Sequence, residues 1–171
     1  IIQLLPVNDT GAESSPYSAR SAFALNPVFI NVQSVEGSSE YEDEIRAGKA
    51  DFKKYGKIDY YNITTWKRMI LRKIFDNRYD DLKKDKVLQR WIDDNAWAKP
   101  YCVYCTLKAQ NDERSWKDWK NYRDPTEKDI EALWKKFLKD NLYQAWMQFE
   151  AEKQFSAAVA EVSKMGIRIK G

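Results

Sequence analysis

Cys102 and Cys105 are the residues whose type and spacing come closest to a chemically reactive motif. A structural zinc site needs four ligands, usually Cys or His, but the sequence has 2 Cys and 0 His. A thioredoxin-type role requires a βαβ pattern around the pair, which is missing here. Two thiols three residues apart in an apolar helical stretch are expected to fill the core. We therefore expect no metal or other cofactor, and two cysteines without a disulfide framework fit a reducing compartment.

The absence of histidine excludes mechanisms that this chain would have to build alone, such as a Ser-His-Asp triad or a Cys-His pair. Carboxylates are abundant, in runs at 40–44, 80–81 and 93–94. A paired-carboxylate glycosidase needs two acids that face one sugar about 5–10 Å apart. Neighbouring acids on a helix point in different directions, so we interpret these runs as solvated surface. Asp9 and Glu13 differ, because they follow the first predicted strand in a loop.

Aromatic and basic residues alternate at 66–68 and 116–120, a pattern that can combine base stacking with phosphate contacts. However, 26 Asp and Glu offset 29 Lys and Arg, and the net charge is only +3. We therefore expect no nucleic-acid partner. Helical spacing predicts core positions for four tryptophans: Trp66, Trp91, Trp134 and Trp146. Trp116 and Trp119 lie in a polar stretch and are the two that could be exposed, where aromatic faces suit sugars.

The overall composition predicts a folded protein, since hydrophobic residues make up 43% of the sequence. The mean hydropathy is −0.72 and no apolar run approaches about 18 residues, so we expect no membrane span. The first 33 residues hold three of the five prolines and few charges. Within them, the polar cluster at 8–15 predicts a loop, 21–25 one helical turn, and 28–32 an extended segment.

From residue 38 onward, periodicity and end signals predict helices. Ser39 and Glu42 fit a capping box that opens the first helix, which should end near 55–56. The further helices are expected after a cap at Asp59 or Asn62, at 82–94, from Pro100 through Leu107, after Thr126 with Asp129, and at 142–164. Val87, Leu88, Trp91 and Ile92 should share one face of the helix at 82–94. Residues 110–124 are the expected long loop.

Both ends of the sequence are strand-like, and no initiator methionine is present. We therefore expect this chain to be an internal fragment of a larger protein. Strands cut out of a larger sheet expose unpaired edges, so the isolated fragment is expected to self-associate.

Several blocks of the sequence resemble the 4-α-glucanotransferase family, which includes amylomaltase and the disproportionating enzymes. The N-terminal blocks are Leu4–Thr10 (LLPVNDT), Ser15–Ser18 (SPYS) and Ser21–Pro27 (SAFALNP). Asn95–Lys108 is similar to a segment of the helical insert in one subfamily, and Gln148–Gly171 to the helix and strand before the family's next conserved loop. The Asn8-Asp9-Thr10 variant looks most like the cytosolic plant-type disproportionating enzyme and its bacterial relatives, which implies a cytoplasmic location.

The resemblance implies a mainly α fold, a helical insertion between the second and third strands of a (β/α)8 barrel. Residues 1–33 would be a barrel strand plus the donor-site loop, 34–165 the helical insertion, and 166–171 the start of the next barrel strand. In such a barrel the insertion would cap the C-terminal face, where barrel enzymes place their sites.

The resemblance also implies transfer of α-1,4-glucosyl or maltosyl units from maltose or malto-oligosaccharides to a glucan by a retaining mechanism. The catalytic carboxylates of the family would lie beyond Gly171, so the fragment alone is expected to be inactive. The substrate-binding residues implied here are Ser15, Tyr17 and Asp9, with Asp9 a candidate for orienting the loop through its backbone N–H groups. Ala12 stands where amylomaltases have an aromatic residue that forms a remote glucan site.

A second interpretation comes from a different class of protein, a non-catalytic helical module. It would bind a glucan or a protein partner through Trp116, Trp119 and Tyr122. The sequence that follows residue 171 distinguishes the two: the enzyme requires an acid-bearing barrel loop there, and the module does not.

Overall fold

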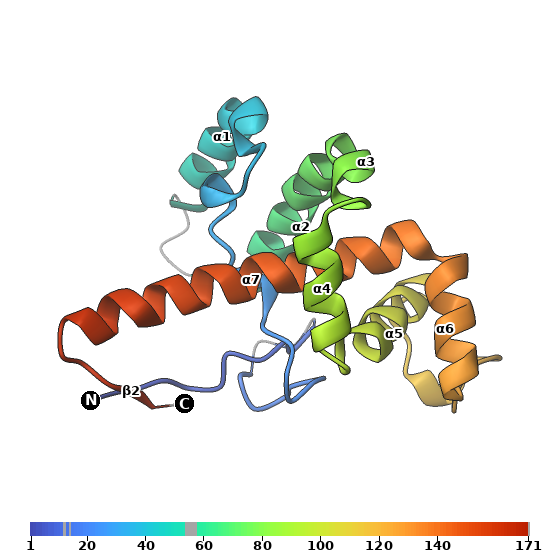
Figure 1. Cartoon of the computed structure of the whole chain (residues 1–171). Coiled ribbons are helices and arrows are strands. Elements are labelled where there is room, and N and C mark those ends of the chain that lie inside the picture. The colour runs from blue at the N-terminus through green and yellow to red at the C-terminus, as the bar shows by residue number, and fades with distance from the viewer. Residues whose placement is uncertain (12, 14, 54–57, 171) are drawn as a thin grey trace. The chain divides into compact units, whose positions relative to one another are not determined.

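The computed structural model describes residues 1–11, 13, 15–53 and 58–170, and this part of the chain is mainly helical, as predicted. The helices and strands are β1 (Ile2–Gln3), η1 (Pro27–Phe29), η2 (Val32–Ser34), η3 (Ser38–Tyr41), α1 (Glu42–Lys53), α2 (Tyr60–Asn77), α3 (Tyr79–Leu82), α4 (Lys86–Asp94), α5 (Ala98–Gln110), η4 (Trp116–Asp118), α6 (Glu127–Lys136), α7 (Leu138–Lys164) and β2 (Ile169–Lys170) (Figure 1). The chain forms two compact units: unit 1 comprises Ile1–Arg78 with Gln148–Gly171, and unit 2 comprises Tyr79–Met147.

The two strands of unit 1 pair in parallel, with Ile2 opposite Ile169 and Gln3 opposite Lys170. Backbone hydrogen bonds of 2.8 Å from Ile2 N to Arg168 O and from Leu4 N to Lys170 O extend the pairing. Both ends of the chain therefore lie side by side, next to the end of α7 (Figure 1). Parallel strands require a crossover connection, and here everything between residues 3 and 169 forms it.

Unit 1 buries the helix faces that hydrophobic periodicity predicts. Its core side chains are Ile30, Val32, Val35, Ile45, Ile70, Leu71, Ile74 and Phe75. Asp59 caps α2, as predicted, by accepting a hydrogen bond from Asn62 N. Gly48 lets α1 approach α2 closely, because a Cβ at this position would lie 2.3 Å from Trp66 Nε1.

Three local predictions in unit 1 are wrong. The expected helical turn at 21–25 is absent, because the Ser21 hydroxyl accepts hydrogen bonds from the backbone N–H groups of Phe23 and Ala24 instead. The expected extended segment at 28–32 is reduced to Ile30 and Asn31, because Val28 and Phe29 lie in η1, which Asn26 caps, and Val32 begins η2. Ser39 is not a cap, since it lies inside η3. The predicted helix end at 55–56 lies outside the described residues.

Two helices of unit 2, α4 and α6, begin at side-chain caps. Asp85 accepts hydrogen bonds from Val87 N and Leu88 N, so α4 begins at Lys86, later than the predicted start at Leu82, which is the last residue of α3. Val87 does not join the buried face of α4, because it lies in the first turn of the helix and its side chain is exposed. The capping box of Thr126 and Asp129 opens α6 as predicted.

The core of unit 2 contains both cysteines. Cys102 and Cys105 are buried on α5, which confirms the prediction that they fill the core. Burial raises the pKa of the Cys102 thiol well above its ordinary value. Trp134 and Trp146 are buried as expected, whereas Trp66 and Trp91 are only half-buried.

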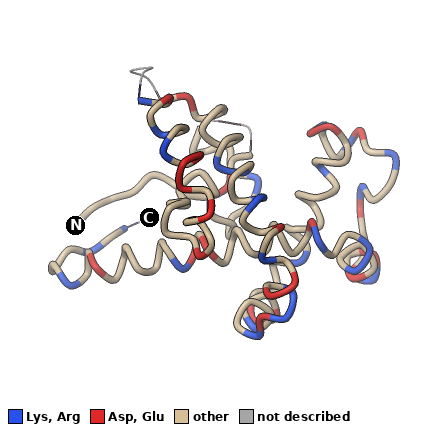
Figure 2. Tube along the Cα trace, turned by 90° about the horizontal axis from the view of Figure 1, so that it is seen from above, with Lys and Arg blue, Asp and Glu red and all other residues tan. Residues whose placement is uncertain are grey.

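The surfaces of the units agree with the composition. Lys and Arg are interspersed with Asp and Glu along the helices (Figure 2).

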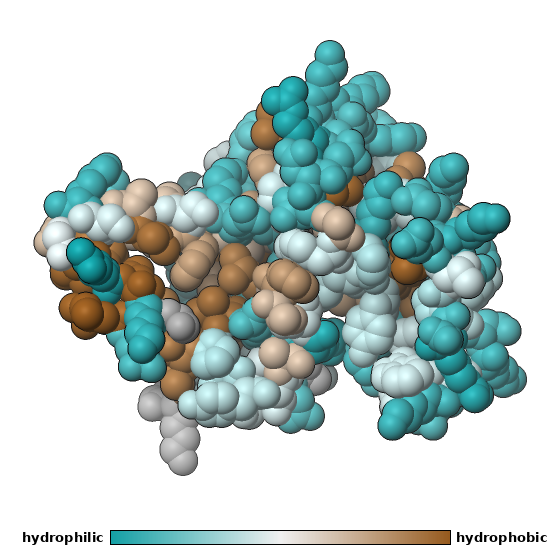
Figure 3. All heavy atoms as spheres, turned by 60° about the horizontal axis from the view of Figure 1, so that its bottom comes forward, coloured by the Kyte–Doolittle hydropathy of each residue, from teal (hydrophilic) through white to brown (hydrophobic). Residues whose placement is uncertain are grey.

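Hydrophobic side chains gather over the paired strands and chain ends of unit 1 (Figure 3), where Ile1, Ile2, Leu5 and Met165 are exposed. Of the helices in the described part of the chain, none has the length and apolar character needed to span a membrane.

Candidate functional site

The candidate site is a loop in unit 1, residues 7–26, which we call the N-terminal loop. An antiparallel bridge between Asn8 and Leu25 closes its base. Two backbone hydrogen bonds flank this bridge, from Asp9 N to Ala24 O at 2.8 Å and from Asn26 N to Val7 O at 2.9 Å. The loop therefore begins and ends at one fixed position.

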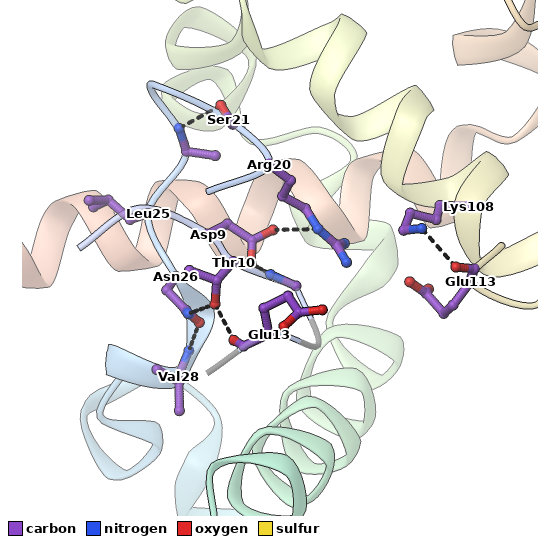
Figure 4. A network of polar contacts seen from close by, with 12 residues as sticks. Asp9, Thr10, Glu13, Arg20, Ser21, Leu25, Asn26, Val28, Lys108 and Glu113 are labelled. Carbon is purple, nitrogen blue, oxygen red and sulfur yellow. Dashed lines mark hydrogen bonds and ion pairs between the residues drawn. The ribbon is translucent and has the colours of Figure 1, made fainter. Parts of the chain in front are cut away.

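Asp9 organises the interior of the loop. Its side chain is 1% exposed, and Oδ1 accepts a hydrogen bond of 3.0 Å from Gly11 N. Oδ2 lies 3.9 Å from Arg20 Nε, and Arg20 N donates to Asp9 O at 2.8 Å (Figure 4). The prediction that Asp9 orients the loop through backbone N–H groups is confirmed by the contact with Gly11. A contact between Asp9 and substrate stays a prediction.

Gly11 is required where it stands for two reasons. Its φ of +64° is a left-handed conformation that other residues adopt at a cost, and a Cβ would lie 1.7 Å from Arg20 Nη2. The Arg20 guanidinium therefore packs directly on the backbone of Gly11. Asp9, Gly11 and Arg20 thus form one packed group inside the loop.

A second set of polar contacts joins the start of the loop to its last residue, Asn26. The Thr10 hydroxyl donates to Glu13 O at 2.6 Å and accepts from Asn26 Nδ2 at 3.2 Å (Figure 4). Beyond the loop, Lys67 on α2 donates to Val28 O at 2.5 Å and to Ile30 O at 2.8 Å. Burial lowers the pKa of Lys67, and the nearby charge of Lys49 adds to this effect.

Ser15 and Tyr17, two of the predicted substrate-binding residues, lie on this fixed loop. The Ser15 hydroxyl accepts a hydrogen bond of 3.4 Å from Tyr17 N, and Ser18 N donates to Ser15 O at 3.1 Å. The resulting turn at Pro16 leaves the Tyr17 side chain 75% exposed. A phenol in this position offers a hydroxyl for hydrogen bonds and a ring face for stacking. The expectation about Ala12 falls outside the described residues.

Sequence reasoning missed two contributors, Arg20 and Gln148. Arg20 follows the recognised SPYS block, and only its contact with Asp9 distinguishes it from an ordinary surface cation. Gln148 is separated from the loop by more than 100 residues, so no local pattern predicts its hydrogen bonds to Leu25. Among the described residues, no group of three or more His, Cys, Asp or Glu is placed to hold a metal ion.

The aromatic residues at 111–124, which we call the tryptophan loop, form the alternative site in unit 2. Trp116 is 44% exposed, as expected, and Tyr122 is exposed too. Trp119, however, is only 3% exposed, so the prediction that it is available to a ligand is wrong. Its ring packs against Tyr104 at 5.7 Å between centroids, and its Nε1 donates to Arg114 O at 3.2 Å.

Comparison with known proteins decides the family. A family model described as 4-alpha-glucanotransferase matches residues 1–171, the whole chain. The chain belongs to the 4-alpha-glucanotransferase family. The resemblance seen in the sequence blocks is thereby confirmed, and it extends over the full length given.

Similar 4-alpha-glucanotransferases occur in a plant and in bacteria. The protein named 4-alpha-glucanotransferase DPE2 from Oryza sativa subsp. japonica is 29% identical over 187 residues, which cover 100% of this chain and 19% of that protein. The 4-alpha-glucanotransferase of Clostridium butyricum is 28% identical over 176 residues, with 99% of this chain and 35% of the relative covered. That of Thermus thermophilus is 26% identical over 173 residues, with 99% and 34% covered. The chain thus spans about a fifth to a third of the length of these curated relatives.

Proposed function

We propose that this chain is the part of a longer 4-α-glucanotransferase that lines the donor side of its sugar-binding cleft. The enzyme transfers α-1,4-glucosyl or maltosyl units from maltose or malto-oligosaccharides to a glucan acceptor. The observation that carries this proposal is the N-terminal loop, which holds Tyr17 exposed on a turn while buried Asp9 binds Gly11 before that turn and faces Arg20 after it. A loop with internal contacts and an exposed aromatic hydroxyl is suited to a sugar, which needs both stacking and hydrogen bonds.

In the proposed retaining mechanism, one carboxylate forms a glucosyl-enzyme intermediate and a second serves as acid and then as base. A glucan 4-hydroxyl, in place of water, accepts the sugar. Residues of this chain hold the donor: the Tyr17 phenol and the Ser15 hydroxyl contact the sugar beside the bond that breaks. Neither residue takes part in bond breaking, so their contribution is to binding and orientation.

We further propose that β1 and β2 are neighbouring strands of a (β/α)8 barrel and that 34–165 is an insertion between them. The parallel register of Ile2 with Ile169 supports this, because neighbouring strands of such a barrel are parallel. The exposed apolar side chains over these strands also support it, since a surrounding barrel would cover them. The isolated fragment should self-associate through the same strands, and the full-length enzyme should reside in the cytoplasm.

The proposal is tested by assaying glucose release from maltose with the full-length protein. Wild type should transfer, Tyr17→Ala should lose about 10²-fold in kcat/KM, and Ser15→Ala should lose less. Trp116→Ala is the matched control, an exposed aromatic in unit 2 whose removal should leave transfer unchanged. A wild-type enzyme without transfer activity overturns the proposed function, while full activity in Tyr17→Ala restricts the loop to a structural role.

A helical binding module is the second candidate function. Trp116 and Tyr122 are exposed in one loop, which favours a ligand that stacks on aromatic side chains. Trp119 cannot contribute to it, because its ring is buried. Binding of malto-oligosaccharides that is lost in Trp116→Ala but kept in Tyr17→Ala would support this candidate over the first.

A further inference from the structure

Gln148 on α7 binds the backbone of Leu25 in the way that a neighbouring strand would. Its Oε1 accepts a hydrogen bond of 2.8 Å from Leu25 N, and its Nε2 donates to Leu25 O at 2.9 Å. Gln148 is 2% exposed and Leu25 is half-buried, so both hydrogen bonds are partly buried. Removing such a buried amide leaves two backbone groups of Leu25 without these partners.

Leu25 is also the residue that closes the base of the N-terminal loop. Its bridge partner is Asn8, and the flanking hydrogen bonds use Ala24 O and Asn26 N. In an extended strand the N–H and C=O groups of alternate residues point to opposite edges, so Leu25 presents its own pair to Gln148. The Gln148 amide therefore links α7 to the 24–26 segment, and that segment is in turn hydrogen-bonded to the 7–9 segment.

The next residue in this arrangement is Asp9, whose carboxylate holds Gly11 and faces Arg20. The contacts from Gln148 thus run through Leu25 and the neighbouring backbone of Ala24 to Asp9, and from Asp9 to Gly11 and Arg20, which precede and follow Tyr17 in the loop. All of these residues belong to unit 1.

A second glutamine on α7 makes the same kind of contact elsewhere and serves as an internal reference. Gln154 accepts from Asn31 N at 2.7 Å and donates to Asn31 O at 3.2 Å. Asn31 lies between η1 and η2, outside the N-terminal loop, and this pair is exposed. The two glutamines therefore lie on the same helix and make the same hydrogen bonds, but they differ in burial and in which backbone segment they hold.

We propose that Gln148 is a positioning residue for the donor-binding loop, acting through Leu25 and Asp9 on the orientation of Tyr17. This inference rests on the proposed function. The Gln148 side chain makes no contact with substrate in this account, and it fixes the base from which the loop projects. Its loss is expected to disorder the loop without removing any sugar-binding group.

The test is a double-mutant cycle in the full-length enzyme with maltose as substrate. Gln148→Leu should lower kcat/KM by about 10-fold in the wild-type background and by less than about 2-fold in a Tyr17→Ala background, because both changes act on the same loop. Gln154→Leu is the control and should stay within about 2-fold of wild type at matched folded concentration. Additive effects of Gln148→Leu and Tyr17→Ala, or equal effects of the two glutamine changes, would overturn the inference.

Amide hydrogen exchange of the same full-length variants provides a readout independent of activity. Gln148→Leu should speed exchange in peptides from residues 7–26, and Gln154→Leu should not. Gln148→Met covers the case in which the leucine variant fails to fold, since it removes both hydrogen-bonding groups but keeps an unbranched side chain of similar length. Unchanged exchange at 7–26 in folded variants refutes the positioning role. If the wild type is inactive but Gln148→Leu still speeds exchange at 7–26, only the proposed function is refuted.

Discussion

The N-terminal loop and the tryptophan loop both present exposed aromatic side chains, but they are held in opposite ways. The N-terminal loop is closed by Leu25, which in turn is bound by Gln148, 123 positions away in the sequence. The tryptophan loop is organised by near neighbours: Lys108 donates to Glu113 O at 2.7 Å and to Arg114 O at 3.1 Å. Its anchor, Trp119, packs against Tyr104 on the preceding helix α5.

This difference shows which loop depends on the rest of the fold. Local contacts in the tryptophan loop form whenever α5 forms, because loop closure over a few residues costs little entropy. The two hydrogen bonds between Leu25 and Gln148 require that α7 and the N-terminal segment have already come together. A loop held by distant elements can be tuned by changes far from it in the sequence, which suits a substrate-binding element of a larger enzyme.

Removal of the tryptophan-loop anchor should have the largest effect on stability. Trp119→Ala deletes a buried aromatic ring and is expected to cost about 3–5 kcal/mol. Trp116→Ala, three residues away and half-exposed, should cost less than about 1 kcal/mol. Chemical denaturation of the two variants checks this. Equal midpoints would refute the claim that Trp119 anchors the tryptophan loop.

A change inside the N-terminal loop should act on transfer more than on stability. Gly11→Ala places a methyl group against the Arg20 guanidinium and adds a left-handed conformational cost of about 1–2 kcal/mol. We expect a loss of about 10-fold or more in kcat/KM for maltose. Gly166→Ala is the matched control, since its φ is +74° but no atom lies within 4 Å of the added Cβ. Comparable transfer rates in the two variants would contradict a role for the packed loop interior.

The helix cap that follows the tryptophan loop should have the smallest effect and a defined pH dependence. Hydrogen bonds from the Thr126 hydroxyl and backbone N–H lower the pKa of Asp129 below its ordinary value of 3.8. The charged form is therefore favoured by folding, so its stabilisation is present above pH 3.8 and is lost as the pH falls through the lowered pKa.

Thr126→Ala tests this dependence through melting temperatures. The variant should melt slightly below wild type at pH 7, and the difference should shrink as the pH falls below 3.8 through the lowered pKa of Asp129. A difference that stays constant over this acid titration would show that the carboxylate contributes nothing through the cap.

Features with local causes could be predicted from the sequence. Asp59 and the pair Thr126 and Asp129 form the predicted caps, because a cap depends only on residues within one turn. The Ser15–Tyr17 turn was indicated by family resemblance alone. The 3-10 helices η1 and η2 were missed. Asn26 caps η1, and Lys67 on a different helix binds the carbonyl groups of Val28 and Ile30.

The burial of Trp119 and the role of Gln148 could not be predicted, because each depends on a contact with a residue in a different segment of the chain. A polar stretch normally predicts exposure, but Tyr104 on α5 covers the Trp119 ring. A glutamine on a helix normally predicts a solvated side chain, yet Gln148 is buried against Leu25. In both cases the deciding partner lies outside the window that periodicity and spacing describe.

The most direct test of the central claim compares the two loops in one experiment. Amide hydrogen exchange of the full-length protein is measured with and without saturating malto-oligosaccharides. The account predicts slower exchange at residues 7–26 in the presence of sugar and unchanged exchange at 111–124. Protection at 111–124 with no change at 7–26 would contradict it and would assign glucan binding to the tryptophan loop.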